Sequence, residues 1–412
     1  MSTSVSAAPD SRAAIRAIVL GSVIVMLAVG IRASFGLFMQ PMGVAQGWGR
    51  EVFSNAFALQ NLVWGLSAIG MGAIADRWGA GRAIAFSLLC YALGLIGMRY
   101  AGSELALYLS AGVLVGLGQG GATFGVILPV VARAVPMASR STAMGIVSAG
   151  GSLGQFILVP SGQWLMNTFD WHGTLWVLSA VLAFAIPIAY GLRGKVQSAP
   201  GIVGETSLSR ALKQAISDRS YHFLFWSYFV CGFQTAFILL HLPAYATDSG
   251  LSPTSGAIAV ALIGLFNVLG SFWAGKLGGR YSKKRLLAGI YWARALAVVV
   301  VLSLPLSAPV LYVFAAAMGV FWLGTVPLTQ GLIGQIYGLR FAATLSGVVF
   351  LGHQVGSSLG VWLAGRVYAL TGSYDPIWWC SIALGVMAGA LCLPINESSR
   401  NAAAAPVAQP AT

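Results

Sequence analysis

Twelve apolar runs, each close to the ~20 residues that a bilayer core requires, are the feature that most constrains the fold of this chain. The runs lie near 15–39, 52–75, 82–100, 104–130, 139–165, 172–192, 221–247, 254–278, 284–305, 308–331, 341–367 and 375–394. Backbone N–H and C=O groups find no water in hydrocarbon, so a spanning segment must be a helix or part of a closed barrel. The runs lack the alternation of barrel strands. The sequence therefore predicts an all-α membrane protein with twelve transmembrane helices.

Composition supports this fold class. The chain is 58% hydrophobic and 8% charged, whereas a soluble domain is about half apolar and about a quarter charged. The net charge of +13 does not predict a nucleic-acid partner, because the basic residues are spread through short loops between apolar runs. The four cysteines (Cys90, Cys231, Cys380 and Cys392) lie inside runs without metal-ligand or disulfide spacing. We expect no metal and no cofactor.

The Lys and Arg residues predict the orientation of the helices, because cytoplasmic loops carry an excess of them. With the N-terminus inside, three basic residues fall in outer loops: Arg50, Arg99 and Arg366. The inner side then holds Arg12, Arg16, Arg77, Arg82, Arg133, Arg140, Arg193, Lys195, Arg210, Lys213, Arg219, Lys276, Arg280, Lys283, Lys284, Arg285, Arg340 and Arg400. We therefore expect a multi-pass protein of the inner (cytoplasmic) membrane with both termini cytoplasmic. The first run is long enough to span, so no cleavable signal peptide is expected.

A long charged segment, 193–219, separates the sixth run from the seventh and predicts a cytoplasmic linker. The expected organisation is a cytoplasmic tail at 1–14, a six-helix half at 15–192, the linker, a second six-helix half at 220–396 and a disordered cytoplasmic tail at 397–412. Two stretches recur between the halves. Residues 72–82, GAIADRWGAGR, match 275–285, GKLGGRYSKKR, and residues 145–162 match 347–364 with Gly145/Gly347, Gly150/Gly352 and Gly154/Gly356 kept.

The stretch at 72–82 resembles the signature loop G-x-x-x-D-R-x-G-x-x-R between the second and third helices of the major facilitator superfamily. The second copy keeps the glycine and the arginines but has Gly279 in the place of Asp76. The resemblance implies two six-helix pseudo-repeats that rock about a site near the membrane midplane. It also implies conformational-gating roles for Gly72, Asp76, Arg77, Arg82, Gly275 and Arg280.

Two arginines, Arg32 and Arg294, lie well inside runs, whereas all ten acidic residues fall in loops, tails or run ends. An arginine at the centre of a spanning helix costs about 2.5–3.5 kcal/mol on insertion scales, so it normally faces a cavity or a partner. A guanidinium in a water-filled cavity can bind a carboxylate with two hydrogen bonds. The alternative is that either arginine binds backbone carbonyl groups or extends to the membrane surface.

The surroundings of Arg32 carry a second resemblance. They read GIRASFGLF at 30–38, and GWGREVFS follows at 47–54. This arrangement is similar to the monocarboxylate porter branch, in which a Lys or Arg precedes a Ser/Phe-rich end of the first helix and a Gly-Trp element lies close by. Animal members of the branch carry an Asp and an Arg in the eighth helix, where this chain has Asn267 and Ser271. Arg294 could replace that missing cation in space.

Polar side chains on the runs expected to line a cavity complete the predicted site. The predicted substrate-binding residues are Arg32, Gln60, Asn61, Trp64, Gln119, Gln234, Asn267, Arg294, Trp322, His353 and Gln354. Single amides in such helices also serve to join neighbouring helices. Imidazole titrates near neutral pH, so His353 and His241 are the predicted proton-coupling residues. The substrate's own carboxyl group is the second route for a proton.

Together these features predict a secondary active transporter that moves a small organic anion, a monocarboxylate, by alternating access with proton symport. An anion exchanger or uniporter stays open, as does a drug or metabolite exporter of the same fold. Exporters usually carry an Arg in the fourth helix and a Gly-Pro pair in the fifth, where this chain has Gly112 and Gly154-Gln155. No run holds a nucleophile–base pair, so an enzyme or a receptor is not expected. The expected partners are the anion, H⁺ and the lipid bilayer, and the expected state is a monomer.

Overall fold

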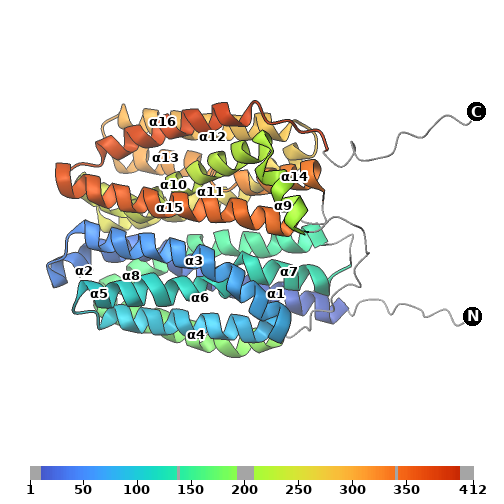
Figure 1. Ribbon diagram of the computed structural model, residues 1–412. Helices are drawn as coiled ribbons and strands as arrows, with labels where there is room; N and C mark the ends of the chain where they lie inside the picture. Colours follow the sequence, from blue (N-terminus) through green and yellow to red (C-terminus); the bar gives the residue numbers. More distant parts are fainter. Residues whose placement is uncertain (1–10, 137–139, 193–207, 339–341, 400–412) are drawn as a thin grey trace, which may run out of the picture.

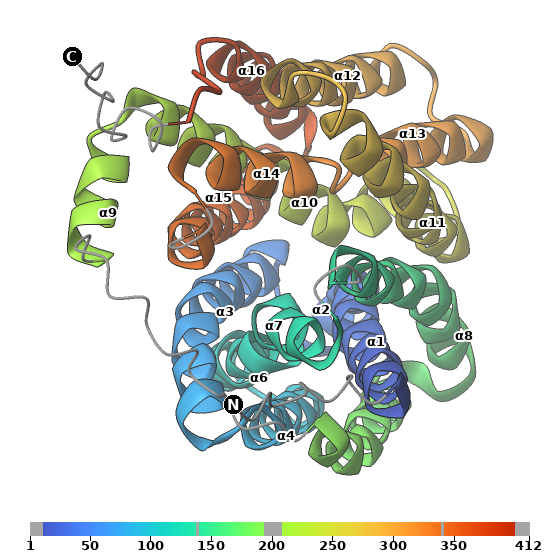
Figure 2. The same cartoon turned by 90° about the vertical axis from the view of Figure 1, so that its right-hand side faces the viewer.

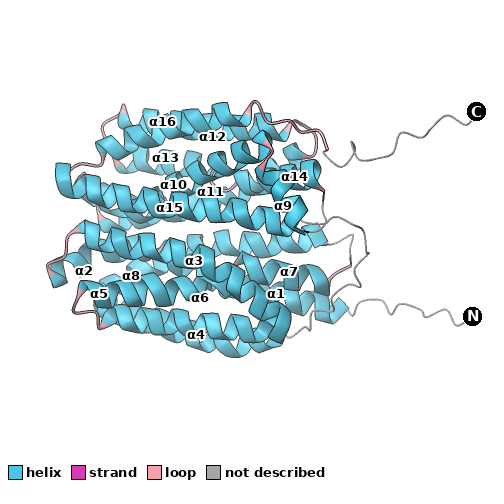
Figure 3. Cartoon of the chain, in the orientation of Figure 1, coloured by secondary structure: helices cyan, strands magenta, loops and turns pink. Residues whose placement is uncertain are grey.

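The computed structural model describes residues 11–136, 140–192, 208–338 and 342–399, and in these ranges it contains helices and no strand (Figure 3). The first part of the chain forms α1 (Ser11–Ala33), η1 (Phe35–Phe38), α2 (Met39–Gln46), α3 (Arg50–Trp78), α4 (Ala80–Arg99), α5 (Glu104–Leu107), η2 (Tyr108–Leu114), α6 (Val115–Ala122), α7 (Phe124–Ala134), α8 (Arg140–Ala189) and η4 (Tyr190–Leu192). The second part forms α9 (Leu208–Ile216), α10 (Arg219–Asp248), α11 (Pro253–Gly278), α12 (Lys283–Leu302), α13 (Ala308–Val320), α14 (Thr325–Tyr337), α15 (Ala342–Thr371) and α16 (Asp375–Cys392).

Within the described ranges, 11 helical segments are long and apolar enough to cross a membrane. The longest runs from Ala143 to Leu192 and has 50 residues, far more than the ~20 that one crossing needs. Asp170, with φ 57° and ψ −175°, interrupts its helical backbone. Each arm on either side of Asp170 is long enough for one crossing. Counted as two arms, this segment brings the helices into line with the twelve runs of the sequence.

The helices gather into two groups that lie side by side (Figure 1). Seen along the helices, α1–α8 form one group and α10–α16 form the other (Figure 2). The groups meet where α3 packs along α15, where α8 packs along α11, and where η1 lies against α10. These three contacts form the boundary between the two halves.

The internal repeat reappears as the same helix contact in both halves. In the first half α8 packs along α1, and in the second α15 packs along α10. Gly154 lies so close to the carbonyl oxygen of Met26 that a Cβ would overlap it, and Gly356 lies in the same way against Phe229. Small residues at such positions let helix backbones approach closely in a membrane. The two glycines that the repeat aligns are therefore equivalent packing positions.

The stretch 72–82, expected as a loop, is mostly helical. Helix α3 continues to Trp78 and α4 begins at Ala80, so the turn is the single residue Gly79. Its φ of 97° is a conformation that glycine adopts without steric cost. Hydropathy marks where a helix leaves the membrane and not where the helix ends, which is why the sequence misplaced this boundary.

Two segments expected as linker or tail are partly structured. Residues 208–216 of the predicted linker form α9, while 193–207 lie outside the described residues. Glu397, expected to open a disordered tail, accepts hydrogen bonds from Lys284 N (2.8 Å) and Ser282 Oγ (3.2 Å) at the start of α12. Unpaired N–H groups and the helix dipole favour a carboxylate at that position.

Candidate functional site

Arg32 lies in the last turn of α1 and directs its guanidinium toward α3. Its Nη2 donates to Asn61 Oδ1 (2.6 Å), and its Cζ lies 4.9 Å from the centre of the Trp64 ring. Among the described residues, Nε has no hydrogen-bond partner and no Asp or Glu forms an ion pair with Arg32. The guanidinium therefore combines an uncompensated charge with an unused donor.

Neighbouring groups hold the two partners of Arg32 in place. Asn61 Nδ2 donates to the carbonyl oxygen of Phe57, one turn earlier on α3 (2.8 Å), which leaves Oδ1 facing the guanidinium. Trp64 Nε1 donates to Thr123 Oγ1 (3.2 Å), and that hydroxyl donates to Gln119 O (2.7 Å). The amide oxygen and the indole face are thus fixed before any ligand arrives.

A row of rings connects Arg32 to the second half. Trp64 contacts Phe350 edge to face with 5.9 Å between ring centres, and Phe350 stacks on His353 at 5.9 Å. His353 in turn lies 4.8 Å from the Tyr228 ring on α10. Beside this row, Gln354 Nε2 donates to Asn61 O (3.4 Å), and Gln354 Oε1 lies 3.0 Å from His353 Nδ1. His353 is therefore linked to the Arg32 site through both rings and amides.

A small cavity adjoins Arg32 between the two halves. Its lining is Arg32, Phe35, Gly36, Phe57, Gln60, Asn61, Ala236, Leu239, Leu240 and Val361. The volume of about 20 Å³ is room for about one water molecule. A larger hollow of about 630 Å³ lies beside α9 and the start of α10. That hollow holds none of the predicted site residues, so we place the candidate site at Arg32.

The predicted substrate-binding residues separate into two sets. Arg32, Gln60 and Asn61 line the cavity. Trp64, His353 and Gln354 lie next to it through the contacts described above. Gln119 joins them because its Nε2 donates to Gln60 Oε1 (3.4 Å). Gln234, Asn267, Arg294 and Trp322 are not in the lining. Gln234 Nε2 donates to Ser381 O (2.9 Å). Asn267 Nδ2 donates to Ser152 Oγ across the boundary between the halves (2.9 Å).

Arg294 has a different environment from Arg32. It is fully buried in α12, where Nε donates to Phe321 O (2.8 Å) and Nη2 donates to Trp322 O. These carbonyl groups belong to the break between α13 and α14, where helical hydrogen bonds are missing. The guanidinium thus caps a broken helix, which is the alternative that the sequence left open for an intramembrane arginine.

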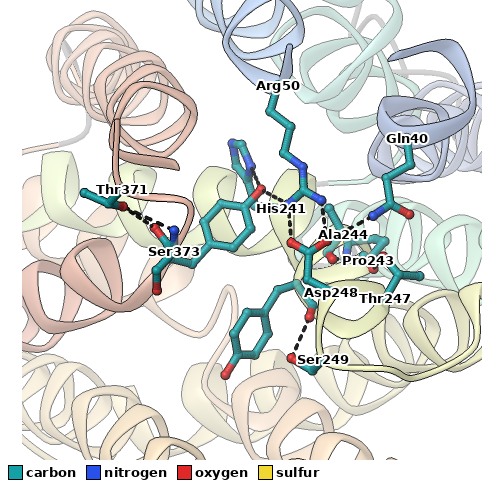
Figure 4. Close-up of polar contacts among 12 residues, drawn as sticks. Gln40, Arg50, His241, Pro243, Ala244, Thr247, Asp248, Ser249, Thr371 and Ser373 are labelled. Atoms are coloured by element: carbon teal, nitrogen blue, oxygen red, sulfur yellow. Dashed lines mark hydrogen bonds and ion pairs between the residues drawn. The ribbon is translucent and has the colours of Figure 1, made fainter. Parts of the chain in front are cut away.

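A second polar cluster joins the halves at the end of the bundle that the predicted orientation makes outer. This outer-end cluster consists of Gln40, Arg50, His241, Asp248 and Tyr374. Figure 4 shows the first four of these residues. Arg50 Nη1 and Nη2 each lie 2.5 Å from a carboxylate oxygen of Asp248, and Gln40 Nε2 donates to the same carboxylate (3.4 Å). Tyr374 Oη accepts from Arg50 Nη1 (3.0 Å) and lies 2.9 Å from His241 Nδ1. The cluster ties α2 and α3 to α10 and the start of α16.

The predicted gating residues lie at the opposite end. The side chains of Arg77, Arg82 and Arg280 are exposed there, and a Cβ added at Gly72 or Gly275 would meet open space. The side chain of Asp76 lies outside the described residues.

The sequence did not single out the apolar part of the cavity or the Arg50–Asp248 pair. Phe35, Phe57, Leu240 and Val361 look like any other apolar residue of a run. Arg50 and Asp248 sit at loop boundaries 198 positions apart, and only the docking of the halves brings them together.

Two helical halves related by a repeat, with a cavity between them that holds a cation lacking a carboxylate partner among the described residues, are typical of two-domain membrane transporters. The chain belongs to the Major Facilitator Superfamily, whose family model matches it over two overlapping ranges, residues 18–361 and 224–408. It is similar to an uncharacterized MFS-type transporter, YcxA, of Bacillus subtilis (24% identity, covering 83% of this chain and 85% of that one). It is also similar to monocarboxylate transporter 13 of Bos taurus (25% identity, 89% and 84%) and monocarboxylate transporter 11 of Mus musculus (26% identity, 80% and 83%).

Solved structures share the fold. A mutant form of the nucleoside transporter NupG superposes with a TM-score of 0.73 at 13% identity and covers 92% of this chain and 99% of its own. The D-xylose-proton symporter gives a TM-score of 0.72 at 12% identity, with 94% and 99% covered. At these identities the likeness concerns the fold alone.

Proposed function

We propose that this protein carries a small organic anion, a monocarboxylate, by alternating access between its two halves. The observation that carries the proposal is Arg32, whose guanidinium borders a cavity between the halves with an unused Nε and no carboxylate partner among the described residues. A carboxylate accepts two parallel hydrogen bonds from a guanidinium. The names of the monocarboxylate transporters among the relatives agree with this chemistry.

The proposal includes a route for a proton. His353 is half-buried and connects to Asn61 through Gln354, and Asn61 binds Arg32. Protonation of the imidazole changes the charge at one end of this chain of contacts, and anion binding changes it at the other. We therefore propose proton symport through His353, with His241 of the outer-end cluster as the second candidate.

The test is ligand-induced thermal stabilisation of the purified protein by sodium butyrate and sodium benzoate, followed by flux in proteoliposomes. Arg32→Gln keeps hydrogen bonding and removes the charge, so affinity should fall about 10- to 100-fold, since a hydrogen bond to a charged group contributes roughly 1.5–3 kcal/mol. Arg32→Lys should retain part of the response. Arg285→Gln, which removes the same charge from an exposed position on α12, should bind as the unaltered protein does.

A folded Arg32→Gln protein with unchanged stabilisation would place the site elsewhere. Flux of a cationic drug instead of acids would favour the exporter alternative. Acid flux that ignores an imposed pH gradient would favour anion exchange.

A further inference from the structure

The polar side chains of the cavity all come from the first half of the protein, whereas the second half contributes only apolar ones. The three polar side chains of the lining, Arg32, Gln60 and Asn61, belong to α1 and α3. The second half contributes Ala236, Leu239 and Leu240 from α10 and Val361 from α15, whose side chains are hydrocarbon only. A ligand held between the halves therefore meets its hydrogen bonds on one side and an apolar wall on the other.

Rings from the first half extend the apolar wall. Phe35 and Phe57 stack with 5.3 Å between ring centres and 27° between planes, and both are buried. Gly36 lies against the carbonyl oxygens of Leu239 and Leu240 on α10, where a Cβ would have no room. Because of this contact, the two phenylalanines stand next to the hydrocarbon side chains of the second half.

The other polar groups of the cavity are already engaged. Gln60 Nε2 donates to Ala111 O (2.8 Å), and its Oε1 accepts from Gln119. Asn61 uses Oδ1 for Arg32 and Nδ2 for Phe57 O. Arg32 Nε, by contrast, is a buried donor of the lining without a partner among the described residues. The lining thus offers one anion position, at Arg32, and its two amides are engaged. Another unpartnered polar atom among the described residues is Oε1 of Gln119, a residue that hydrogen-bonds Gln60 but is not part of the lining.

We infer that the acid carried is a monocarboxylate with an apolar tail, branched or aromatic, and without a hydroxyl group or a second carboxylate. Arg32 binds the carboxylate of the acid. The side chains that surround its apolar tail, once the halves part to admit the acid, are those of Phe35, Phe57, Leu240 and Val361. A hydroxyl group against this wall would lose its hydrogen bonds to water without replacement. This inference rests on the proposed function, because it assigns the second end of the same ligand.

Matched acids test the inference in the purified full-length protein. Isobutyrate and lactate differ by a methyl group in place of the hydroxyl, and we expect isobutyrate to bind on the order of 10- to 100-fold more tightly. Across acetate, propionate and butyrate, affinity should rise about fourfold for each methylene. Succinate, with a second carboxylate, should give no stabilisation at the concentrations that saturate with butyrate.

A substitution in the apolar wall of the cavity gives a second test. Val361→Thr replaces a methyl group by a hydroxyl group and keeps the shape of the side chain. It should lower the ratio of the affinity for isobutyrate to that for lactate by about threefold or more. Val349→Thr makes the same exchange at a fully buried position of the same helix that is not in the cavity lining, and it should leave the ratio unchanged.

The outcomes separate the two proposals. If lactate binds as tightly as isobutyrate, or if affinity is flat from acetate to butyrate, the apolar-tail inference is overturned while carboxylate binding at Arg32 stands. If no acid of either series stabilises the protein, the proposed function itself fails. An equal change of the ratio in both valine variants would also overturn the assignment of Val361 to the tail.

Discussion

Breaking the Arg50–Asp248 pair should shift the protein toward conformations in which the outer end is open. The pair joins α3 of one half to α10 of the other, so it can exist only while these helices are together. An exposed ion pair contributes ~0–1 kcal/mol, and a hydrogen bond to a charged group contributes about 1.5–3 kcal/mol. The pair is bidentate, with side chains 14% and 29% exposed. We therefore expect the pair to stabilise the form that is closed at the outer end by about 1–2 kcal/mol. Its loss should change the ratio of closed to open forms roughly 5- to 30-fold.

The measurement is the distance between spin labels placed at Val44 and Ser249, exposed positions on α2 and at the end of α10, in a background without the native cysteines. Arg50→Gln and Asp248→Asn should each raise the long-distance population. The exchanged variant, Arg50→Asp with Asp248→Arg, should return it toward that of the unaltered pair.

Arg366→Gln is the control for this prediction. It breaks the Arg366–Glu51 pair, which also joins the halves at the outer end but has side chains 53% and 42% exposed, so its shift should be smaller. Unchanged distances in folded Arg50→Gln and Asp248→Asn proteins would refute the reasoning. An equally large shift in Arg366→Gln would show that any surface charge has the same effect.

Two further predictions concern turnover and coupling. Asp76→Asn should slow transport more than it weakens ligand binding. Asp76 lies on α3 near the inner end, away from the cavity, and should stabilise one rocking state through charge contacts. Unchanged transport with unchanged KM would contradict this. Uptake in proteoliposomes should rise as external pH falls below neutral, and His353→Gln should flatten that dependence while leaving exchange at equal pH largely intact; a His353→Gln protein with the original pH profile would move the coupling role to His241.

The helical membrane fold and its repeat could be predicted from the sequence because both follow from local requirements. Each run must satisfy its own backbone hydrogen bonds in lipid, whatever its neighbours are. The repeat predicted equivalent glycines, and Gly154 and Gly356 do occupy equivalent close contacts with the carbonyl groups of Met26 and Phe229. Arg32 was also evident, because a charge is conspicuous in an apolar run.

The tertiary structure was needed to separate the two intramembrane arginines. Both stand in apolar runs with no acidic residue, so the sequence assigned both to the substrate site. Arg32 meets an amide oxygen, a ring face and a cavity, while Arg294 meets the carbonyl groups freed where α13 ends. A break in a neighbouring helix cannot be read from the residues around Arg294 itself.

The apolar wall and the outer-end cluster were likewise decided by packing between the halves. Leu240 and Val361 are of the same residue types as those that face lipid, because lipid, protein core and cavity all accept hydrocarbon side chains. Arg50 and Asp248 are ordinary loop-boundary charges until α3 and α10 are placed side by side. The sequence by itself determined which segments cross the membrane and where a charge must be accommodated. Only the docking of the two halves decided what surrounds that charge, because contacts between residues some 200 positions apart leave no local pattern in the chain.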